Sequence, residues 1–245
     1  MAIRFRCLYD GTEFHGFQQQ VGLVTVQGTL QRTFEELLGP GKVIGAGRTD
    51  RGVHAQGQVV VWRGESAIPI ERLVPVLNRR LPESIQLSHA TVVDDAWDPI
   101  RCALGKRYTY RLWRCRSAAL PWLRYTYAMT APLSWERLQE SADMFLGTHD
   151  FRAFRGEGSS AKTTIRTVST SRWLKEESGS IWCYQVQADG FLYHMVRMMV
   201  GAMLEDALVG PERAVVGRGL ADPRGPKVSG PVPASGLTLE EILYA

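Results

Sequence analysis

The chain has 245 residues, of which 44% are hydrophobic and 22% are charged, and its formal net charge is +4. This composition is ordinary for a soluble globular protein, and the length is sufficient for one large domain or two small ones. The four cysteines show no paired short spacing, the N-terminus has no apolar signal core, and the longest apolar run, Phe191–Leu204, is too short for a bilayer. These features argue against a zinc site and a membrane span, and they predict a cytoplasmic protein with reduced thiols.

The N-terminal part of the chain predicts the element order β-α-β-β-α-β. Apolar residues alternate in the strand expected over Ala2–Asp10, and Thr25 can cap the helix that follows, which ends at Gly39. The other expected elements are strands over Lys42–Gly47 and Val53–Arg63, a helix over Ile70–Leu81, and a strand over Ile85–Val93. This order is typical of the split βαβ, or ferredoxin-like, arrangement.

The remainder of the chain repeats this order without a detectable sequence repeat. The expected strands are Gly105–Arg116, Arg166–Glu176, Ser180–Ala188 and Leu237–Tyr244, and the expected helices are Trp135–Leu146, capped by Ser134, and Phe191–Leu208. A boundary near Asp98 divides the chain into domains 1–100 and 101–245, and segments 155–160 and 217–236 have the composition of mobile loops. We therefore predict an α+β fold with two ferredoxin-like (split βαβ) halves. Their antiparallel sheets would join into one long sheet with helices on one face and a central cleft.

The turn that precedes the strand over Val53–Arg63 concentrates polar side chains. These are Arg48, Thr49, Asp50 and Arg51. By composition alone, such a turn is a plain hairpin tip. Glycines at positions 45, 47, 52 and 57 allow backbone or a ligand to approach closely, and His54, Gln56 and Gln58 project from one face of the strand. A hairpin tip requires none of these features, so the turn is a candidate functional site.

A second feature is the basic stretch from Arg101 to Arg124, which contains no acidic residue. Its seven basic positions are 101, 106, 107, 111, 114, 116 and 124, and they are interleaved with Tyr108, Tyr110, Trp113 and Trp122. Basic side chains neutralise phosphates and aromatic faces stack on bases, so the pattern indicates a nucleic-acid surface. A solvated charged strand is the alternative.

The polar turn closely resembles the catalytic loop of the tRNA pseudouridine synthase A family, in the run Gly47-Arg48-Thr49-Asp50-x-Gly52-Val53-His54-Ala55. Two further segments resemble the same family: Ala103–Tyr110 is similar to its strand with a base-packing tyrosine, and Gly190–Met198 to its second motif. The resemblance extends over nearly the whole chain. It departs at Phe17, Arg51 and Met198, where the family commonly has tryptophan, a small residue and asparagine.

This resemblance implies an enzyme that isomerises uridine to pseudouridine on the 3′ side of the tRNA anticodon stem-loop. It implies that Asp50 is the nucleophile, that Tyr108 packs on the target base, and that Arg48 helps to hold the target nucleotide out of the helix. Arg197 would partner Asp50, because a carboxylate in a water-poor pocket stays ionised only beside a cation. The partner is then tRNA, bound in the central cleft by a homodimer, and the reaction needs no metal and no small-molecule cofactor.

The residues alone leave several roles open. Asp50 has three routes: attack at C6 of the base, attack at C1′ of the ribose, or removal of a ribose proton to give a glycal. Arg197 on an apolar helix is also compatible with a structural end-cap or a snorkelling residue, and Tyr108 with a core position. The role of His54 is not assigned.

Two rival functions come from other classes. A non-catalytic RNA-binding protein with twin RRM-like sheets fits the expected fold, but it does not require an aspartate among glycines and arginines. A metal-dependent nuclease requires clustered carboxylates, whereas Asp94 and Asp95 are adjacent and would lie on opposite faces of a strand.

Overall fold

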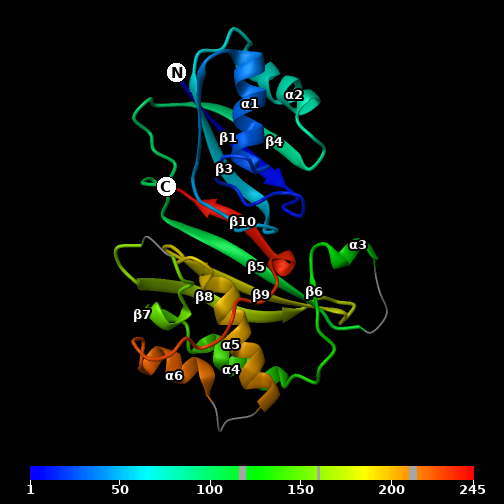
Figure 1. The fold of residues 1–245 in the computed structure, drawn as a ribbon, viewed down its shortest axis with the longest axis vertical. Coiled ribbons are helices and arrows are strands. Elements are labelled where there is room, and N and C mark those ends of the chain that lie inside the picture. Colours follow the sequence, from blue (N-terminus) through cyan, green and yellow to red (C-terminus); the bar gives the residue numbers. More distant parts are fainter. Residues whose placement is uncertain (116–119, 159–160, 210–213) are drawn as a thin grey trace. The chain divides into compact units, whose positions relative to one another are not determined.

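The computed structural model describes residues 1–115, 120–158, 161–209 and 214–245 (Figure 1). The chain forms two compact units: unit 1 contains Met1–Leu104 and Thr238–Ala245, and unit 2 contains Gly105–Leu237. Arg116 of the basic stretch, and the last two positions of the loop expected over 155–160, lie outside the described residues.

Unit 1 has the element order expected from the sequence. Its elements are β1 (Ala2–Tyr9), α1 (Val26–Leu38), β2 (Gly41–Gly45), β3 (His54–Gly64), α2 (Ile70–Arg80) and β4 (Ile85–Val93). The sheet order is β4-β1-β3, with β2 also paired to β3, and all of these neighbours are antiparallel. The ferredoxin-like arrangement expected for this part of the chain is therefore confirmed.

Alternating side chains and helix caps explain why these residues adopt this structure. Ile3, Phe5 and Cys7 all lie buried on one face of β1. Phe34 of α1 packs edge-on against Phe5, with ring centroids 5.4 Å apart, and it also contacts Trp62 of β3. The Thr25 side chain accepts a hydrogen bond from the backbone N–H of Gly28, as expected for a helix cap.

Two strands share one edge of β3. β2 pairs with the later part of β3, from Gly45 opposite Val60 to Gly41 opposite Gly64. β10 (Leu237–Leu243) runs parallel to the start of β3, where Thr238 lies opposite His54. The backbone of β10 approaches so closely that a Cβ on Gly57 would lie 2.2 Å from the carbonyl oxygen of Glu240.

The position of β10 differs from the expectation that Leu237–Tyr244 belongs with the second half. The segment before unit 2 folds back onto this strand: Leu104 N–H donates to Leu243 O over 2.8 Å, and the Tyr244 hydroxyl donates to Pro99 O over 2.8 Å. β2 leaves the edge of β3 at Gly45, and the released edge positions are paired by β10. Long-range pairing decides this placement, so the local pattern does not reveal it.

The strands of unit 2 lie in the order β5-β9-β8-β7 with antiparallel neighbours, and β6 pairs with β5 in parallel. Its elements are β5 (Gly105–Trp113), α3 (Leu120–Leu123), β6 (Tyr127–Ala128), α4 (Trp135–Asp143), β7 (Gly147–Asp150), η1 (Arg152–Phe154), β8 (Ile165–Lys175), β9 (Ile181–Ala188), α5 (Met195–Val209), α6 (Val215–Ala221) and η2 (Ala234–Gly236). In Figure 1, α4, α5 and α6 lie on one face of this sheet. Gln139 of α4 donates its amide to Trp173 O, which ties that helix to β8.

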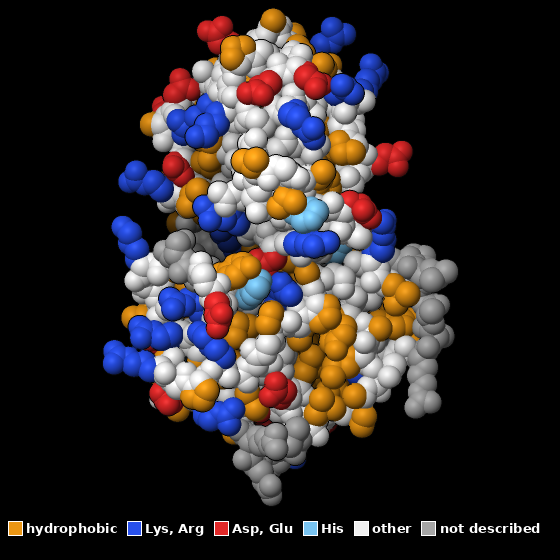
Figure 2. Space-filling view, in the orientation of Figure 1, with side chains coloured by type: hydrophobic (Ala, Val, Ile, Leu, Met, Phe, Trp, Pro, Cys, Tyr) orange, Lys and Arg blue, Asp and Glu red, His pale blue; other side chains and the backbone are white. Residues whose placement is uncertain are grey.

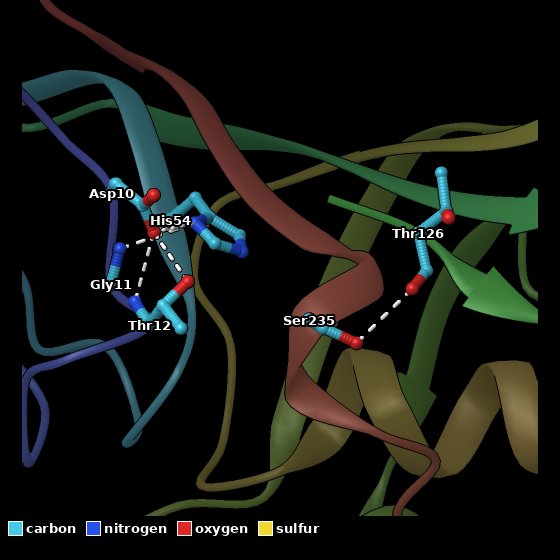
Figure 3. Close-up of polar contacts among 6 residues, drawn as sticks. All are labelled: Asp10, Gly11, Thr12, His54, Thr126 and Ser235. Carbon is cyan, nitrogen blue, oxygen red and sulfur yellow. Dashed lines mark hydrogen bonds and ion pairs between the residues drawn. The ribbon is translucent and has the colours of Figure 1, made fainter. Parts of the chain in front are cut away.

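Two expectations for unit 2 need correction. Helix α5 begins at Met195 and not at Phe191, because His194 has a φ of 59° and cannot continue a right-handed helix. The segment 217–236, expected as a mobile loop, includes most of α6 and all of η2. The Ser235 hydroxyl donates to Thr126 O over 3.2 Å (Figure 3), so this segment is fixed to its own unit.

In the described parts of the chain, no helix is both long and apolar enough to cross a membrane.

Candidate functional site

Thr49 anchors the polar loop between β2 and β3. Its hydroxyl lies 2.8 Å from the hydroxyl of Tyr9 at the end of β1, and this hydrogen bond is buried. Its carbonyl oxygen accepts a hydrogen bond of 3.1 Å from the backbone N–H of Phe17. Arg48 before it is exposed and Asp50 after it is half-buried. The loop therefore turns one side chain inward and leaves its charged neighbours more accessible.

Backbone contacts fix the loop on both sides of Thr49. Ala46 N–H donates to Val59 O over 2.9 Å, and the Gln58 amide donates to Gly47 O over 2.9 Å. Downstream, Val53 N–H donates to Asp50 O over 3.2 Å, which closes the turn. Each of these bonds orders backbone within a few residues of Asp50, so its carboxylate is presented by a rigid support.

The loop after β1 packs directly against this support. Gly16 has a φ of 90°, and a Cβ there would lie 2.8 Å from Thr49 O. The ring of Phe17 packs against the backbone of Gly45, where a Cβ would come within 2.2 Å of the ring. Phe17, one of the departures from the family pattern, thus fills the space beside the polar loop with an aromatic ring. Glycine at position 45 is required by this close approach.

His54 is the first residue of β3, and its ring contacts the residues that follow β1. Its ring Nδ1 lies 3.2 Å from an Asp10 carboxylate oxygen and 3.1 Å from the backbone nitrogen of Gly11 (Figure 3). The same Asp10 oxygen accepts hydrogen bonds from Thr12. A Cβ on Gly11 would lie 2.0 Å from Val53 O, so β1 and β3 meet very closely at this point. The contacts of His54 tie the end of β1 to the strand that follows Asp50.

Arg197 lies in the first turn of α5 in unit 2. Its guanidinium Nε donates to Val232 O over 2.7 Å, and its own carbonyl oxygen faces the backbone N–H of Val232 at 3.4 Å. The Tyr110 hydroxyl donates to the next carbonyl, that of Pro233, over 2.8 Å. Burial raises the pKa of the Tyr110 phenol well above its usual range, and the nearby Arg197 charge opposes part of that rise. Arg197 and Tyr110 therefore hold one segment through two successive carbonyls.

Tyr108 lies two residues before Tyr110 on β5. Its side chain is 7% exposed, and its ring meets Phe191 edge-on, with centroids 5.1 Å apart and planes at 87°. Arg48 and Asp50 thus belong to one loop of unit 1, while Tyr108 and Arg197 belong to unit 2. Met198, another departure from the family pattern, is 3% exposed.

The basic stretch is not the continuous surface that its composition indicates. Tyr110 is fully buried and Trp113 is 9% exposed, whereas Trp122 is 47% exposed. Arg114 donates to the carbonyl oxygens of Met129 and Ala131, and its guanidinium lies 4.6 Å from the Trp182 ring centroid. β5 turns Tyr110 and Trp113 into the core of unit 2, so these two rings do not form part of an exposed stacking surface.

Three supporting residues of the polar loop were not singled out for this role by the sequence. Tyr9, Gln58 and Asp10 contact the loop or its flanks from positions that only the folded sheet brings together. The alternating pattern of β1 showed Tyr9 as an inward-facing residue and gave no sign of its partner. Within the described ranges, no group of three or more His, Cys, Asp or Glu side chains is arranged to hold a metal ion.

Comparisons with known proteins agree with the motif resemblance. Residues 7–99 and 141–245 match the family described as tRNA pseudouridine synthase. The tRNA pseudouridine synthase A of Acetivibrio thermocellus is 40% identical over 96% of this chain and 96% of its own length, and that of Clostridium kluyveri is 37% identical with the same coverage. The protein of the same name from Maridesulfovibrio salexigens is 33% identical over 99% of this chain and 90% of its own length.

Proposed function

Because this chain belongs to the tRNA pseudouridine synthase family, we infer that it is an isomerase that converts uridine to pseudouridine in tRNA. We propose further that its targets lie on the 3′ side of the anticodon stem-loop and that Asp50 is the nucleophile. The observation that carries the proposal is the position of Asp50 beside Thr49, in a loop that buried contacts hold on both sides.

The chemistry requires one nucleophile and a fixed geometry. The C1′–N1 glycosidic bond breaks, the base turns, and a C1′–C5 bond forms, while C5 loses its proton and N1 gains one. An ionised carboxylate can start this sequence by attack at C1′ or C6, or by removing a ribose proton. Neither oxidation nor reduction occurs, so the atoms and electrons balance without a co-reactant. A carboxylate aimed by its support gains rate because the reacting atoms are already placed.

The proposed roles of the other residues use side chains from both units. Arg48 is exposed beside Asp50, which suits a contact to the displaced nucleotide or its phosphate. The edge contact with Phe191 fixes the ring plane of Tyr108, and we assign Tyr108 to packing on the target base. Arg197 supplies a planar cation for the Asp50 carboxylate, and its Nε bond to Val232 O fixes the position of the guanidinium.

The proposed assembly state is a homodimer, on the strength of the family alone. Sedimentation equilibrium should then give twice the chain mass of 27.4 kDa. A fully active monomer would contradict this assignment and would leave the proposed chemistry untouched.

The direct test is to map pseudouridine in tRNA. Purified protein is incubated with an unmodified tRNA transcript, and each uridine is scored by chemical mapping at single-nucleotide resolution. New pseudouridine confined to the 3′ side of the anticodon stem-loop is the expected result. Binding of the transcript without any new pseudouridine would instead support the RNA-binding module as the function.

A further inference from the structure

Tyr193 and His194 form a stacked pair just before α5. Their ring centroids are 3.8 Å apart and their planes differ by 25°. The Tyr193 side chain is nevertheless 46% exposed, so much of its ring faces solvent. An exposed, flat aromatic surface whose plane is already fixed is the feature with which proteins stack unpaired nucleic-acid bases.

The backbone of this pair is held in a conformation that non-glycine residues seldom adopt. His194 has a φ of 59°, and its carbonyl oxygen accepts the N–H of Met198 in the first turn of α5. Gly156 supports the pair from the side. Its N–H donates to Tyr193 O over 2.8 Å, and a Cβ on it would lie 2.9 Å from atoms of both rings. Strained positions of this kind cluster at functional sites, which motivates a search for a ligand here.

Three cations lie along the segments that support the pair. Lys227 donates from Nζ to Arg152 O over 2.8 Å, and Arg155 directly precedes Gly156. Burial, Arg155 and Arg152 all lower the pKa of Lys227, with burial the largest cause, while Glu157 opposes them. These side chains are therefore close enough for their charges to interact. Figure 2 shows Lys and Arg side chains gathered over β7 and α6 of unit 2.

The carboxylates beside these cations offset part of their charge. Asp150 accepts the backbone N–H of Arg152 over 3.0 Å, and the charge of Glu157 raises the pKa of Lys227 against the effects of burial and the two arginines. Three cations thus face two carboxylates in these segments. Positive charge next to an exposed aromatic ring fits an RNA strand, because each nucleotide carries a base that can stack on the ring and a phosphate that can bind a cation.

We propose that Tyr193, His194, Arg152, Arg155 and Lys227 form a contact surface for tRNA, which we call the Tyr193 surface. An unpaired base of the tRNA stacks on the exposed ring of Tyr193, and the neighbouring phosphates bind the three cations. This inference rests on the proposed function for the identity of the RNA. It adds a substrate contact on unit 2. The polar loop between β2 and β3, which we call the Asp50 loop, does not provide this contact.

The test measures the dissociation constant of tRNA by filter binding at two or more salt concentrations. Tyr193→Ala should weaken binding by about tenfold, because loss of one stacked base costs on that order. Tyr193→Phe keeps the ring and should recover most of the affinity. Combined Arg155→Gln and Lys227→Gln should reduce the slope of log affinity against log salt by about one to two. Arg172→Gln is the matched control, since Arg172 is an exposed arginine of unit 2 bound to Gln185 and outside this surface.

The outcomes separate this proposal from the function on which it rests. Wild-type affinity in Tyr193→Ala, in a protein that still forms pseudouridine, overturns the Tyr193 surface alone. A wild-type protein that binds tRNA and forms no pseudouridine overturns the function instead. Thermal unfolding of each variant checks folding, and Gly156→Ala gives an independent variant, because its Cβ should displace both rings and weaken binding without removing either. Equal loss of affinity in Arg172→Gln would show a general charge effect and would also contradict the proposal.

Discussion

The Asp50 loop and the Tyr193 surface are held in different ways. Buried contacts from Tyr9, Phe17 and Gln58 fix the loop, and they come from three separate parts of unit 1. Backbone hydrogen bonds from Gly156 to Tyr193 O and from Met198 to His194 O hold the aromatic pair of the Tyr193 surface. Of its cations, Lys227 is exposed and Arg152 and Arg155 are half-buried. A reacting group must be placed within a fraction of an ångström, whereas binding of a polyanion sums many weak contacts. We therefore propose that the chemistry takes place at the rigid Asp50 loop and that the Tyr193 surface contributes affinity for tRNA.

The largest effect should come from the rigid region. Asp50→Asn keeps the shape of the side chain and removes its charge, so turnover should fall by at least about 10⁴-fold, as for other nucleophiles. The measurement is tritium release from tRNA labelled at C5 of uridine, with tRNA affinity measured in parallel. Affinity should stay close to that of the wild type. Asp95→Asn, a change at an exposed carboxylate of the same unit, is the control. A much smaller loss of turnover in Asp50→Asn than the expected one would contradict the assignment.

Variants of Arg197 test whether unit 2 contributes to the chemistry as well as to tRNA affinity. Arg197 is the proposed cation for Asp50, so Arg197→Met should change the shape of the single-turnover pH–rate profile, whereas loss of a contact to RNA would lower the rate equally at every pH. Arg197→Lys keeps the charge without the planar fork and should recover part of the rate.

The matched control for Arg197 is Tyr110→Phe. It removes the hydrogen bond to Pro233 O while leaving the cation in place, so it reports the effect of loosening the 232–233 segment by itself. A profile lowered equally at every pH in Arg197→Met would mean that Arg197 binds the RNA and does not keep Asp50 ionised.

Tyr9→Phe should show how much the rigid support contributes. The change removes one hydroxyl and leaves Thr49 without that buried partner, which costs about 1 kcal/mol of unfolding free energy. A shift of the loop by a fraction of an ångström should lower the single-turnover rate by about 10-fold to 100-fold.

Tyr244→Phe is the control for Tyr9→Phe, because it removes another tyrosine hydroxyl of unit 1 that is bound to a backbone carbonyl far from Thr49 in sequence. It should lower stability by a similar amount and leave the rate of chemistry close to that of the wild type. Equal rates in the two variants would remove the distinction between a rigid and an adaptable region.

The smallest effect should appear in the stability of unit 2 at alkaline pH. Burial raises the pKa of Tyr184 well above its usual range, although its hydrogen bond to Ser171 opposes the rise. The unfolded chain ionises this phenol near about pH 10 and the folded chain does not, so stability should fall as pH increases through that value. The expected loss is about 1 kcal/mol at about pH 11, measured by urea unfolding. Tyr184→Phe should flatten the dependence, and an unchanged slope would contradict this reading of burial.

Local patterns predicted most of the secondary structure. β4 occupies the expected range Ile85–Val93, and both Thr25 and Ser134 cap their helices. Periodicity and capping depend on residues a few positions apart, so one sequence reveals them. The same locality explains why the start of α5 was placed too early and why the local pattern revealed no partner for the last strand. The left-handed backbone at His194 and the pairing of β10 with β3 are decided by contacts with distant segments.

Only the part of the candidate site that lies within a recognisable motif could be predicted from the sequence. The run around Asp50 is contiguous, so it can be recognised in the sequence alone. Tyr9 lies 40 positions from Thr49, and no local pattern links them. Composition was misleading for the stretch from Arg101 to Arg124, because alternation along β5 buries aromatic residues that composition places beside solvent-facing arginines.

The shared edge of β3 links the folding of unit 1 to the order of synthesis on the ribosome. Thr238 and Leu239 of β10 are translated after every residue of unit 2, yet they pair with His54 and Ala55, a few residues beyond Asp50. While the chain emerges from the ribosome, this edge of β3 lacks its final partner strand, and unpaired strand edges can pair with other chains. The nascent protein therefore has an interval in which the strand next to the Asp50 loop is open to chaperones or to aggregation, and this interval ends only when β10 is released.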